Sequence, residues 1–255
     1  MILTDTHSHI YSEEYSLDQD EVLNRAIGVG VSRIFVPAID SESFESMLRV
    51  EERYPNNVFL MMGLHPTYVK ENYKDELSFV AQKLTERKFS AVGEIGIDLY
   101  WDKTFLKEQQ YAFEYQIQLA KQYNLPINIH CRDAFDEVLE ILEQEKSSGF
   151  KGVFHCFTGN MKQAERAIDS GMKLGIGGVV TFKNGKIDQF LRDIDISNIV
   201  LETDAPYLAP KPFRGKRNES SYIAHIAEKV ADIYGLSLQE VAEITTANSK
   251  DIFGF

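Results

Sequence analysis

The sequence predicts a single α/β domain, residues 1–255, folded as a closed (β/α)8 TIM barrel. Three observations predict this fold. Short β-rich runs alternate with longer amphipathic runs, eight such units follow one another, and 255 residues is the usual length of one barrel. Strict alternation implies right-handed βαβ units and a parallel sheet. No GxGxxG or GxxxxGK[ST] loop follows a predicted strand, which disfavours an open nucleotide-binding sheet.

The expected elements follow in order along the chain. Strands are predicted over residues 2–7, 32–39, 58–65, 90–97, 126–130, 151–157, 173–180 and 198–204. Helices are predicted over residues 18–30, 41–54, 74–87, 105–123, 134–146, 160–170, 184–193, 219–234 and 237–250. Ser41 is the expected start of the second helix, and Ser237 with Glu240 forms a capping box that starts the last one.

The composition is ordinary for a globular protein. The chain is 44% hydrophobic and 26% charged, with a net charge of −12. A protein this acidic has no long-range attraction for nucleic acid or anionic membranes. Binding of a polyanionic substrate would therefore need local positive charge. No run resembles a signal peptide or a membrane span. Two cysteines are too few for a disulfide framework and fit a reducing compartment. We therefore expect a cytoplasmic protein, and we predict neither a membrane nor a protein partner.

Polar residues gather at the predicted carboxyl ends of the strands, where barrel enzymes carry their chemistry. Five of the six histidines lie there, and only His225 falls on a predicted helix. The five are His7, His9, His65, His130 and His155. Two carboxylates, Glu94 and Asp204, occupy equivalent places on other strands. A common edge of the barrel should bring these side chains together.

Six of these residues predict a metal centre: His7, His9, Glu94, His130, His155 and Asp204. His7 and His9 are two positions apart on a strand and therefore point to the same side. Six nitrogen and oxygen ligands are too many for one tetrahedral zinc and suit two metals bridged by Glu94. Two metals can hold a hydroxide and clamp both oxygens of a hydrolytic displacement, with Asp204 accepting a proton. The alternative is a coincidental grouping of structural polar residues.

The motifs in this order resemble the TatD family of metal-dependent deoxyribonucleases, within the amidohydrolase-like barrel superfamily. They are DTHSH (5–9), GLHP (63–66), VGEIGID (92–98), IHCRDA (129–134), HCFTG (155–159), GGVVTFKN (177–184), ETDAPYL (202–208) and PFRGKRNE (212–219). The resemblance implies that the six residues bind two divalent ions, Mg, Mn or Zn, with Glu94 and Asp204 catalytic. It further implies a DNA or oligonucleotide substrate, cut from the 3′ end of single strands. Ser220 and Ser221 depart from the family pattern, which usually has proline beside this predicted substrate loop.

Three further residues are candidates for substrate binding: His65, Arg132 and Arg214. Arg132 is two residues after His130 and should share its inward face, where it would bind a phosphate or form a salt bridge. Arg214 is the best phosphate candidate in the basic stretch 211–217, although such a stretch is often only solvated surface. His65 could donate to a phosphate oxygen or hold a loop.

Other residues near these strand ends have a structural alternative. Asp98 and Glu202 either orient metal ligands or pair elsewhere in the barrel. Tyr100 and Trp101 could stack on a base, although packing on the rim is favoured. The two cysteines, Cys131 and Cys156, should point outward into the helix layer, because each follows an inward histidine.

Three functions fit this pattern. A metal-dependent phosphodiesterase acting on DNA is favoured by the ligand set and the basic rim. A hydrolase of a small amide, lactone or phosphoester would use the same metal site and agrees better with the charge of −12. A non-catalytic metal-binding or scaffold protein would not need all six ligands.

Overall fold

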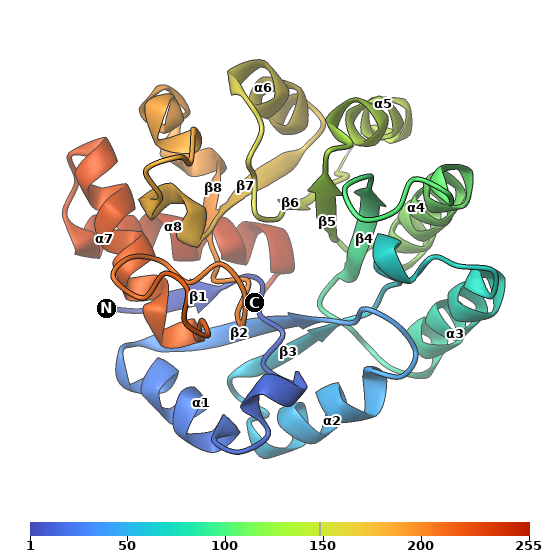
Figure 1. The fold of residues 1–255 in the computed structure, drawn as a ribbon, viewed down its shortest axis with the longest axis horizontal. Coiled ribbons are helices and arrows are strands. Elements are labelled where there is room, and N and C mark those ends of the chain that lie inside the picture. The colour runs from blue at the N-terminus through green and yellow to red at the C-terminus, as the bar shows by residue number, and fades with distance from the viewer. Residues whose placement is uncertain (148) are drawn as a thin grey trace.

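Eight parallel strands form the core of the computed structural model, which describes residues 1–147 and 149–255 (Figure 1). They are β1 (Leu3–Asp5), β2 (Val31–Pro37), β3 (Val58–Met61), β4 (Val92–Asp98), β5 (Ile127–Arg132), β6 (Gly152–Phe154), β7 (Met172–Ile176) and β8 (Ile199–Leu201). Every predicted strand is present. Most end earlier than expected, so the polar residues that follow them lie on loops at the rim.

The strands close into a barrel, as predicted. Regular pairing gives the orders β1-β2-β3 and β4-β5-β6-β7-β8, and backbone hydrogen bonds join these two groups at both seams. Between β3 and β4, the Met62 amide donates to the Ala91 carbonyl at 3.1 Å. Between β8 and β1, the Thr6 amide donates to the Leu201 carbonyl at 3.0 Å. The fold is therefore a (β/α)8 TIM barrel in one α/β domain.

Eight α-helices surround the barrel (Figure 1). In the described residues they are α1 (Gln19–Gly28), α2 (Phe44–Arg53), α3 (Tyr73–Glu86), α4 (Leu106–Tyr123), α5 (Phe135–Glu145), α6 (Met161–Asp169), α7 (Ile223–Tyr234) and α8 (Leu238–Phe253). Each buries an apolar face; α5, for example, buries Val138 and Leu142 four residues apart. The capping box of α8 is confirmed, because the Ser237 side chain accepts from the Glu240 amide and the Glu240 carboxylate accepts from the Ser237 amide.

Three predicted helices differ from the structure. The helix predicted over residues 219–234 begins as an α-helix only at Ile223, after a 3-10 turn over Ser220–Tyr222. Residues 184–193 form two short 3-10 turns instead of an α-helix. The Tyr234 hydroxyl donates to the carbonyls of Leu191 and Ile194 at 2.7 and 2.9 Å, which holds this segment in an irregular path. The second helix begins at Phe44, not at Ser41, because the Ser41 hydroxyl donates instead to Glu76 at 2.9 Å.

The predicted strand 173–180 ends at Ile176, and the next residues form a 3-10 turn.

A Cβ on Gly178 in this turn would lie 2.0 Å from the Leu208 carbonyl oxygen. We expect Gly178→Ala to destabilise the fold by ~1–3 kcal/mol, as overpacking does, and to lower the Tm by roughly 3–10 °C. Thermal unfolding of both variants measures this, with Gly28→Ala as control because its Cβ would meet nothing within 4 Å. Equal Tm values would contradict the close approach.

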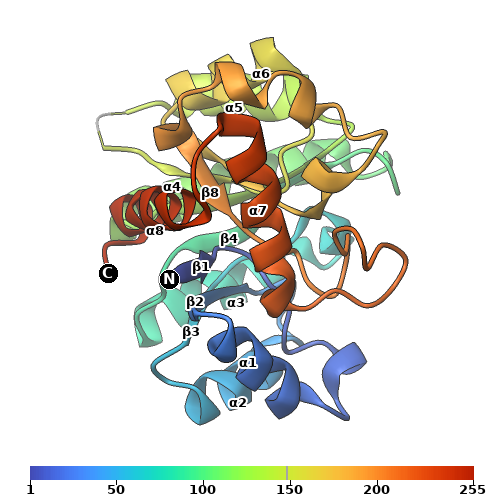
Figure 2. The same ribbon diagram turned by 90° about the vertical axis from the view of Figure 1, so that its left-hand side faces the viewer.

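The two ends of the barrel differ. Figure 2 shows both chain termini on one side, while the loop between β8 and α7 projects on the other. The carboxyl ends of the strands lie on the same side of the barrel as that loop.

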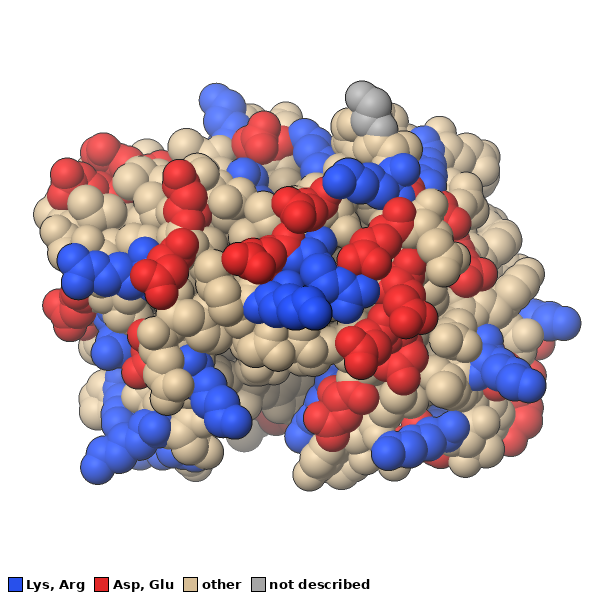
Figure 3. Space-filling view, turned by 90° about the horizontal axis from the view of Figure 1, so that it is seen from above, with Lys and Arg blue, Asp and Glu red and all other residues tan. Residues whose placement is uncertain are grey.

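The surface near α5 and α6 carries charges of both signs. Figure 3 shows this side of the molecule, where acidic and basic side chains interleave. Arg166 of α6 pairs with Glu143 of α5 at 2.7 Å. Among the described residues, no helix is both long and apolar enough to cross a membrane.

Candidate metal centre

A cavity of about 700 Å³ opens at the carboxyl ends of the strands. Its polar lining includes His9, His65, Glu94, Asp98, His130, Arg132, His155 and Asp204. Its aromatic lining is Tyr11, Tyr68, Trp101 and Tyr207. The chain thus places its strand-end histidines and carboxylates around one shared space, as the barrel geometry predicts.

Glu94, on β4, is the centre of the polar cluster. Its Oε2 lies 3.2 Å from Nε2 of His7 and 3.4 Å from Nε2 of His9. Its Oε1 lies 2.8 Å from Nδ1 of His130 and 3.1 Å from Nε2 of His155. Each oxygen of this carboxylate therefore faces two of the predicted histidine ligands, which is the arrangement of a bridging ligand.

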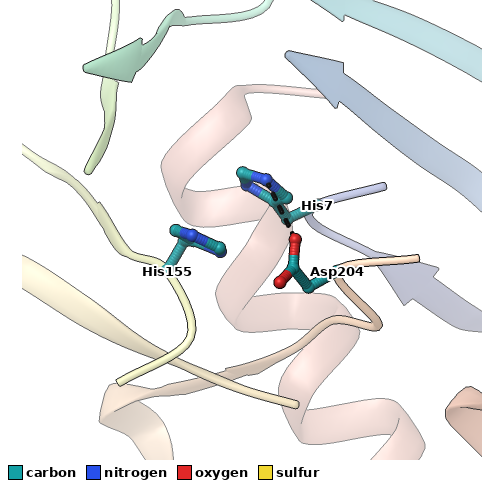
Figure 4. Close-up of side chains that lie close together, drawn as sticks. All are labelled: His7, His155 and Asp204. Carbon is teal, nitrogen blue, oxygen red and sulfur yellow. Dashed lines mark ion pairs between the residues drawn. The ribbon is translucent and has the colours of Figure 1, made fainter. Parts of the chain in front are cut away.

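Asp204 and His155 complete the side of the cluster that faces β1. Figure 4 shows His7, His155 and Asp204 converging from three different elements. The His7 and His155 rings stack with their centroids 3.8 Å apart, and Asp204 Oδ1 lies 3.7 Å from Nε2 of both His7 and His9. All four side chains are nearly or fully buried. Their nitrogen and oxygen atoms are close enough to share a cation.

Outer hydrogen bonds orient three of the histidines. Asn128 accepts from Nδ1 of His7 at 2.8 Å, and Glu202 lies 3.2 Å from Nδ1 of His155. In the neutral form of both rings the proton is then on Nδ1, and the Nε2 lone pair points into the cluster. Such outer partners fix the tautomer of metal-binding histidines.

His130 is oriented in the opposite sense. Asp98 lies 2.9 Å from its Nε2, so Nδ1 is the atom that faces Glu94. The sequence left open whether Asp98 and Glu202 orient a ligand or pair elsewhere, and in the structure each contacts a histidine of the cluster. Asn128 is a partner that the sequence analysis did not name. Its position offered a signal, because it precedes His130 by two residues on β5 and so shares its face.

His65 also reaches Glu94, with Nε2 3.3 Å from Oε1, although the predicted ligand set does not include it. Its other nitrogen accepts a hydrogen bond from the Thr67 amide at 3.2 Å. A backbone N–H can only donate, so Nδ1 carries the lone pair and neutral His65 has its proton on Nε2. This tautomer makes His65 a donor into the cavity, although His65, Glu94 and His130 also lie close enough together to hold a cation.

Burial and mutual charge shift the pKa values of the cluster strongly. Burial, helped by the nearby His155, lowers the pKa of His7 to about 4. Burial alone would raise the pKa of Glu94, but His65, His7 and His155 hold it well below its usual value. Burial works against a charged His155, yet Glu94 and Glu202 raise its pKa well above normal. The Glu94 carboxylate therefore stays ionised at neutral pH in spite of its burial, whereas His7 is neutral.

The protein atoms alone leave this cluster unsatisfied. Glu94 Oε2 is buried without a hydrogen-bond partner among the described residues, and Nε2 of His7 lies only 3.1 Å from Nε2 of His9. A buried carboxylate oxygen without a partner, beside two converging ring nitrogens, is costly unless a cation lies among them. The donor set thus fits divalent metal ions.

Arg132 and Arg214 lie in different surroundings. Arg132 lines the cavity, as predicted, and its guanidinium stacks on the Tyr100 ring at 3.7 Å. Arg214 lies over Phe182 at 4.4 Å and is not among the lining residues. The neighbouring Arg217 pairs with Asp18 at 2.7 Å. The basic stretch 211–217 therefore flanks the cavity without lining it.

The two cysteines differ from each other. Cys131 lies on β5 and packs against the hydrophobic core, although it is also among the residues that line the cavity. Cys156 lines the cavity, and its predicted outward direction is wrong. Strand β6 ends at Phe154, and Cys156 adopts a positive φ of 44°, so the alternation of side chains no longer applies there. Burial raises the pKa of both thiols, which makes them unreactive at neutral pH.

Two other rim features differ from expectation. Trp101, expected to pack on the rim, is 70% exposed and lines the cavity. Ser220 and Ser221, expected beside a substrate loop, are buried. The Ser220 hydroxyl donates to Ser8 at 3.3 Å, and Ser221 bonds to Glu219. The departure from the family pattern therefore lies in the 3-10 turn that leads into α7, outside the cavity lining.

Comparison with known proteins gives one consistent family. The family model described as TatD related DNase matches residues 4–254. The metal-dependent hydrolase YabD of Bacillus subtilis is 38% identical over 253 residues, covering 99% of each chain. The crystal structure of YjjV, a TatD homologue from Escherichia coli, superposes with a TM-score of 0.93 at 32% identity, covering 99% of this chain and 98% of that one.

Proposed function

The chain belongs to the TatD-related DNase family, and on this basis we propose that it is a metal-dependent hydrolase that cleaves DNA phosphodiester bonds. The observation that carries the proposal is the buried Glu94 carboxylate, which has ring nitrogens of five histidines within 3.4 Å. We propose removal of nucleotides from the 3′ end of single strands as the specific activity.

The proposed ligands are His7, His9, Glu94, His130, His155 and Asp204. Glu94 would bridge two divalent ions, Mg, Mn or Zn, because each of its oxygens faces a different pair of histidines. Bound there, the ions would supply Lewis-acid activation of water and of the phosphoryl group.

The residues of this chain would carry the proton and position the phosphate. A water oxygen attacks phosphorus, the bond from phosphorus to the leaving sugar oxygen breaks, and the proton of the water passes to Asp204. Burial raises the pKa of Asp204, which makes this carboxylate a better proton acceptor than an exposed one. Arg132 and the Nε2–H of His65 donate to the phosphate oxygens as charge develops.

Turnover of 3′-labelled single-stranded DNA with added Mg or Mn tests the proposal directly. Release of nucleotides is the expected result. Failure of folded, metal-loaded protein to release any nucleotide would contradict the DNA substrate, although the metal centre would stand.

Arg132→Ala should lower kcat/KM for the oligonucleotide by roughly 10- to 150-fold, because a charge-assisted hydrogen bond is worth ~1.5–3 kcal/mol. Arg214→Ala is the matched control, since this arginine would reach only a strand that extends beyond the cavity. Its effect should be smaller and should be confined to longer oligonucleotides. If the two variants lost equal activity on a dinucleotide, the separate roles of the two arginines would be contradicted.

A hydrolase of a small phosphoester is the second candidate. Arg132 is the only lysine or arginine among the described residues that line the cavity, and the chain carries a net charge of −12. A small monoanion needs no more positive charge than this. High turnover of such an ester without any turnover of DNA would favour this candidate.

A further inference from the structure

The rim of the cavity carries an exposed tryptophan whose role the metal centre does not explain. Trp101 follows β4, lines the cavity and is 70% exposed. A large aromatic ring in this position leaves much apolar surface in water, where nothing from the described part of the chain covers it. An exposed ring at the mouth of a binding cavity is suited to stack on a flat ligand group.

Arg132 lies beside this ring. Its guanidinium carbon is 3.7 Å from the centre of the Tyr100 ring and 5.3 Å from that of Trp101. The guanidinium makes no hydrogen bond or ion pair to a side chain within residues 1–147 and 149–255, so its N–H groups remain available. Stacking on Tyr100 fixes the plane of the guanidinium at low entropic cost, which suits bidentate binding of a phosphate.

Asp98 connects this rim to the metal centre. Its Oδ1 accepts from the amides of Tyr100 and Trp101 at 3.0 and 3.1 Å. Its Oδ2 contacts Nε2 of His130 at 2.9 Å. One buried carboxylate thus holds both the backbone of the aromatic loop and a proposed ligand, which sets their relative positions.

We propose that Trp101 stacks on the nucleobase next to the scissile phosphate while Arg132 binds that phosphate, with Asp98 as the positioning residue. This proposal rests on the proposed nuclease function and names the unit that the cavity recognises. Stacking tolerates any base, because every base presents a flat face. The site would therefore require a base beside the bond it cuts, but no particular sequence.

The chain provides a direct probe of this stacking, because Trp101 is its only tryptophan. Titration of the metal-loaded protein with a phosphorothioate thymidine dinucleotide should change the tryptophan emission in a saturable way. The same dinucleotide with an abasic site in place of one base should leave the emission nearly unchanged. Cleavage of the ordinary dinucleotide without any change in emission on binding would overturn the proposal.

A double-deletion cycle removes the base from the substrate and the Trp101 ring from the enzyme. It separates a stacking role of Trp101 from a role in supporting the loop. Trp101→Ala should raise KM for an ordinary oligonucleotide by about 5- to 150-fold, the equivalent of ~1–3 kcal/mol per stacked base. On an oligonucleotide that is abasic beside the scissile phosphate, the same variant should have little effect, since the partner is already missing. Equal losses on both substrates would show that Trp101 only supports the loop, which overturns the proposal.

Two controls complete the test. Tyr111→Ala removes a similarly exposed aromatic ring from α4, outside the cavity lining, and should leave KM unchanged. Trp101→Phe keeps a smaller stacking face and should restore part of the affinity. A change in emission with the base-bearing dinucleotide but no cleavage of any oligonucleotide would support stacking and reject the nuclease function, so the two failures are distinguishable.

Discussion

Glu94→Gln should abolish hydrolysis while leaving the barrel folded. The substitution keeps the size of the side chain and removes the charge that faces five histidines. Loss of the shared ligand should remove several kcal/mol of transition-state stabilisation, and ~4 kcal/mol corresponds to about a 10³-fold fall in kcat/KM. Steady-state kinetics on an oligonucleotide and elemental analysis of bound metal measure the two effects.

Two controls make this result specific. Glu86→Gln changes an exposed glutamate on α3 that pairs with Lys83 at 2.7 Å, and it should alter neither activity nor metal content. Wild-type protein stripped by a chelator should fall to the residual rate of Glu94→Gln and recover when metal is restored, whereas the variant should not recover. Wild-type metal content and activity in Glu94→Gln would reject Glu94 as the bridging residue.

The clustering of these side chains could be predicted because it depends on two regular features. Side chains on a strand alternate, so His7 and His9 must share a side, and the carboxyl ends of barrel strands meet at one edge. Neither argument needs atomic detail. Both arguments require only that the end of each strand be located to within two or three residues.

Features that depend on irregular backbone could not be predicted in the same way. Cys156 points into the cavity because β6 ends two residues earlier and the chain then takes a positive φ. The segment 184–193 has helical spacing in sequence, but the distant Tyr234 binds its carbonyls. The tautomer of His65 depends on a hydrogen bond from Thr67, which no spacing rule describes.

Asp204→Asn should separate proton transfer from metal binding. Asparagine retains an oxygen that can serve as a ligand but cannot accept the proton of the attacking water at neutral pH. General-base catalysis contributes roughly 10²–10⁴-fold, so kcat should fall by about this factor while KM changes little. The fall should persist at saturating metal, and rate measurements across a metal titration show whether it does.

Glu202→Gln is the matched comparison, because this buried carboxylate lies two residues earlier and faces the outer side of His155 at 3.2 Å. It orients a proposed ligand without reaching the cavity lining, so its loss should weaken metal affinity by about 10- to 100-fold. Added metal should then restore most of the rate in Glu202→Gln but not in Asp204→Asn. If metal rescues both variants equally, Asp204 acts only as a ligand and the proton must pass to another group.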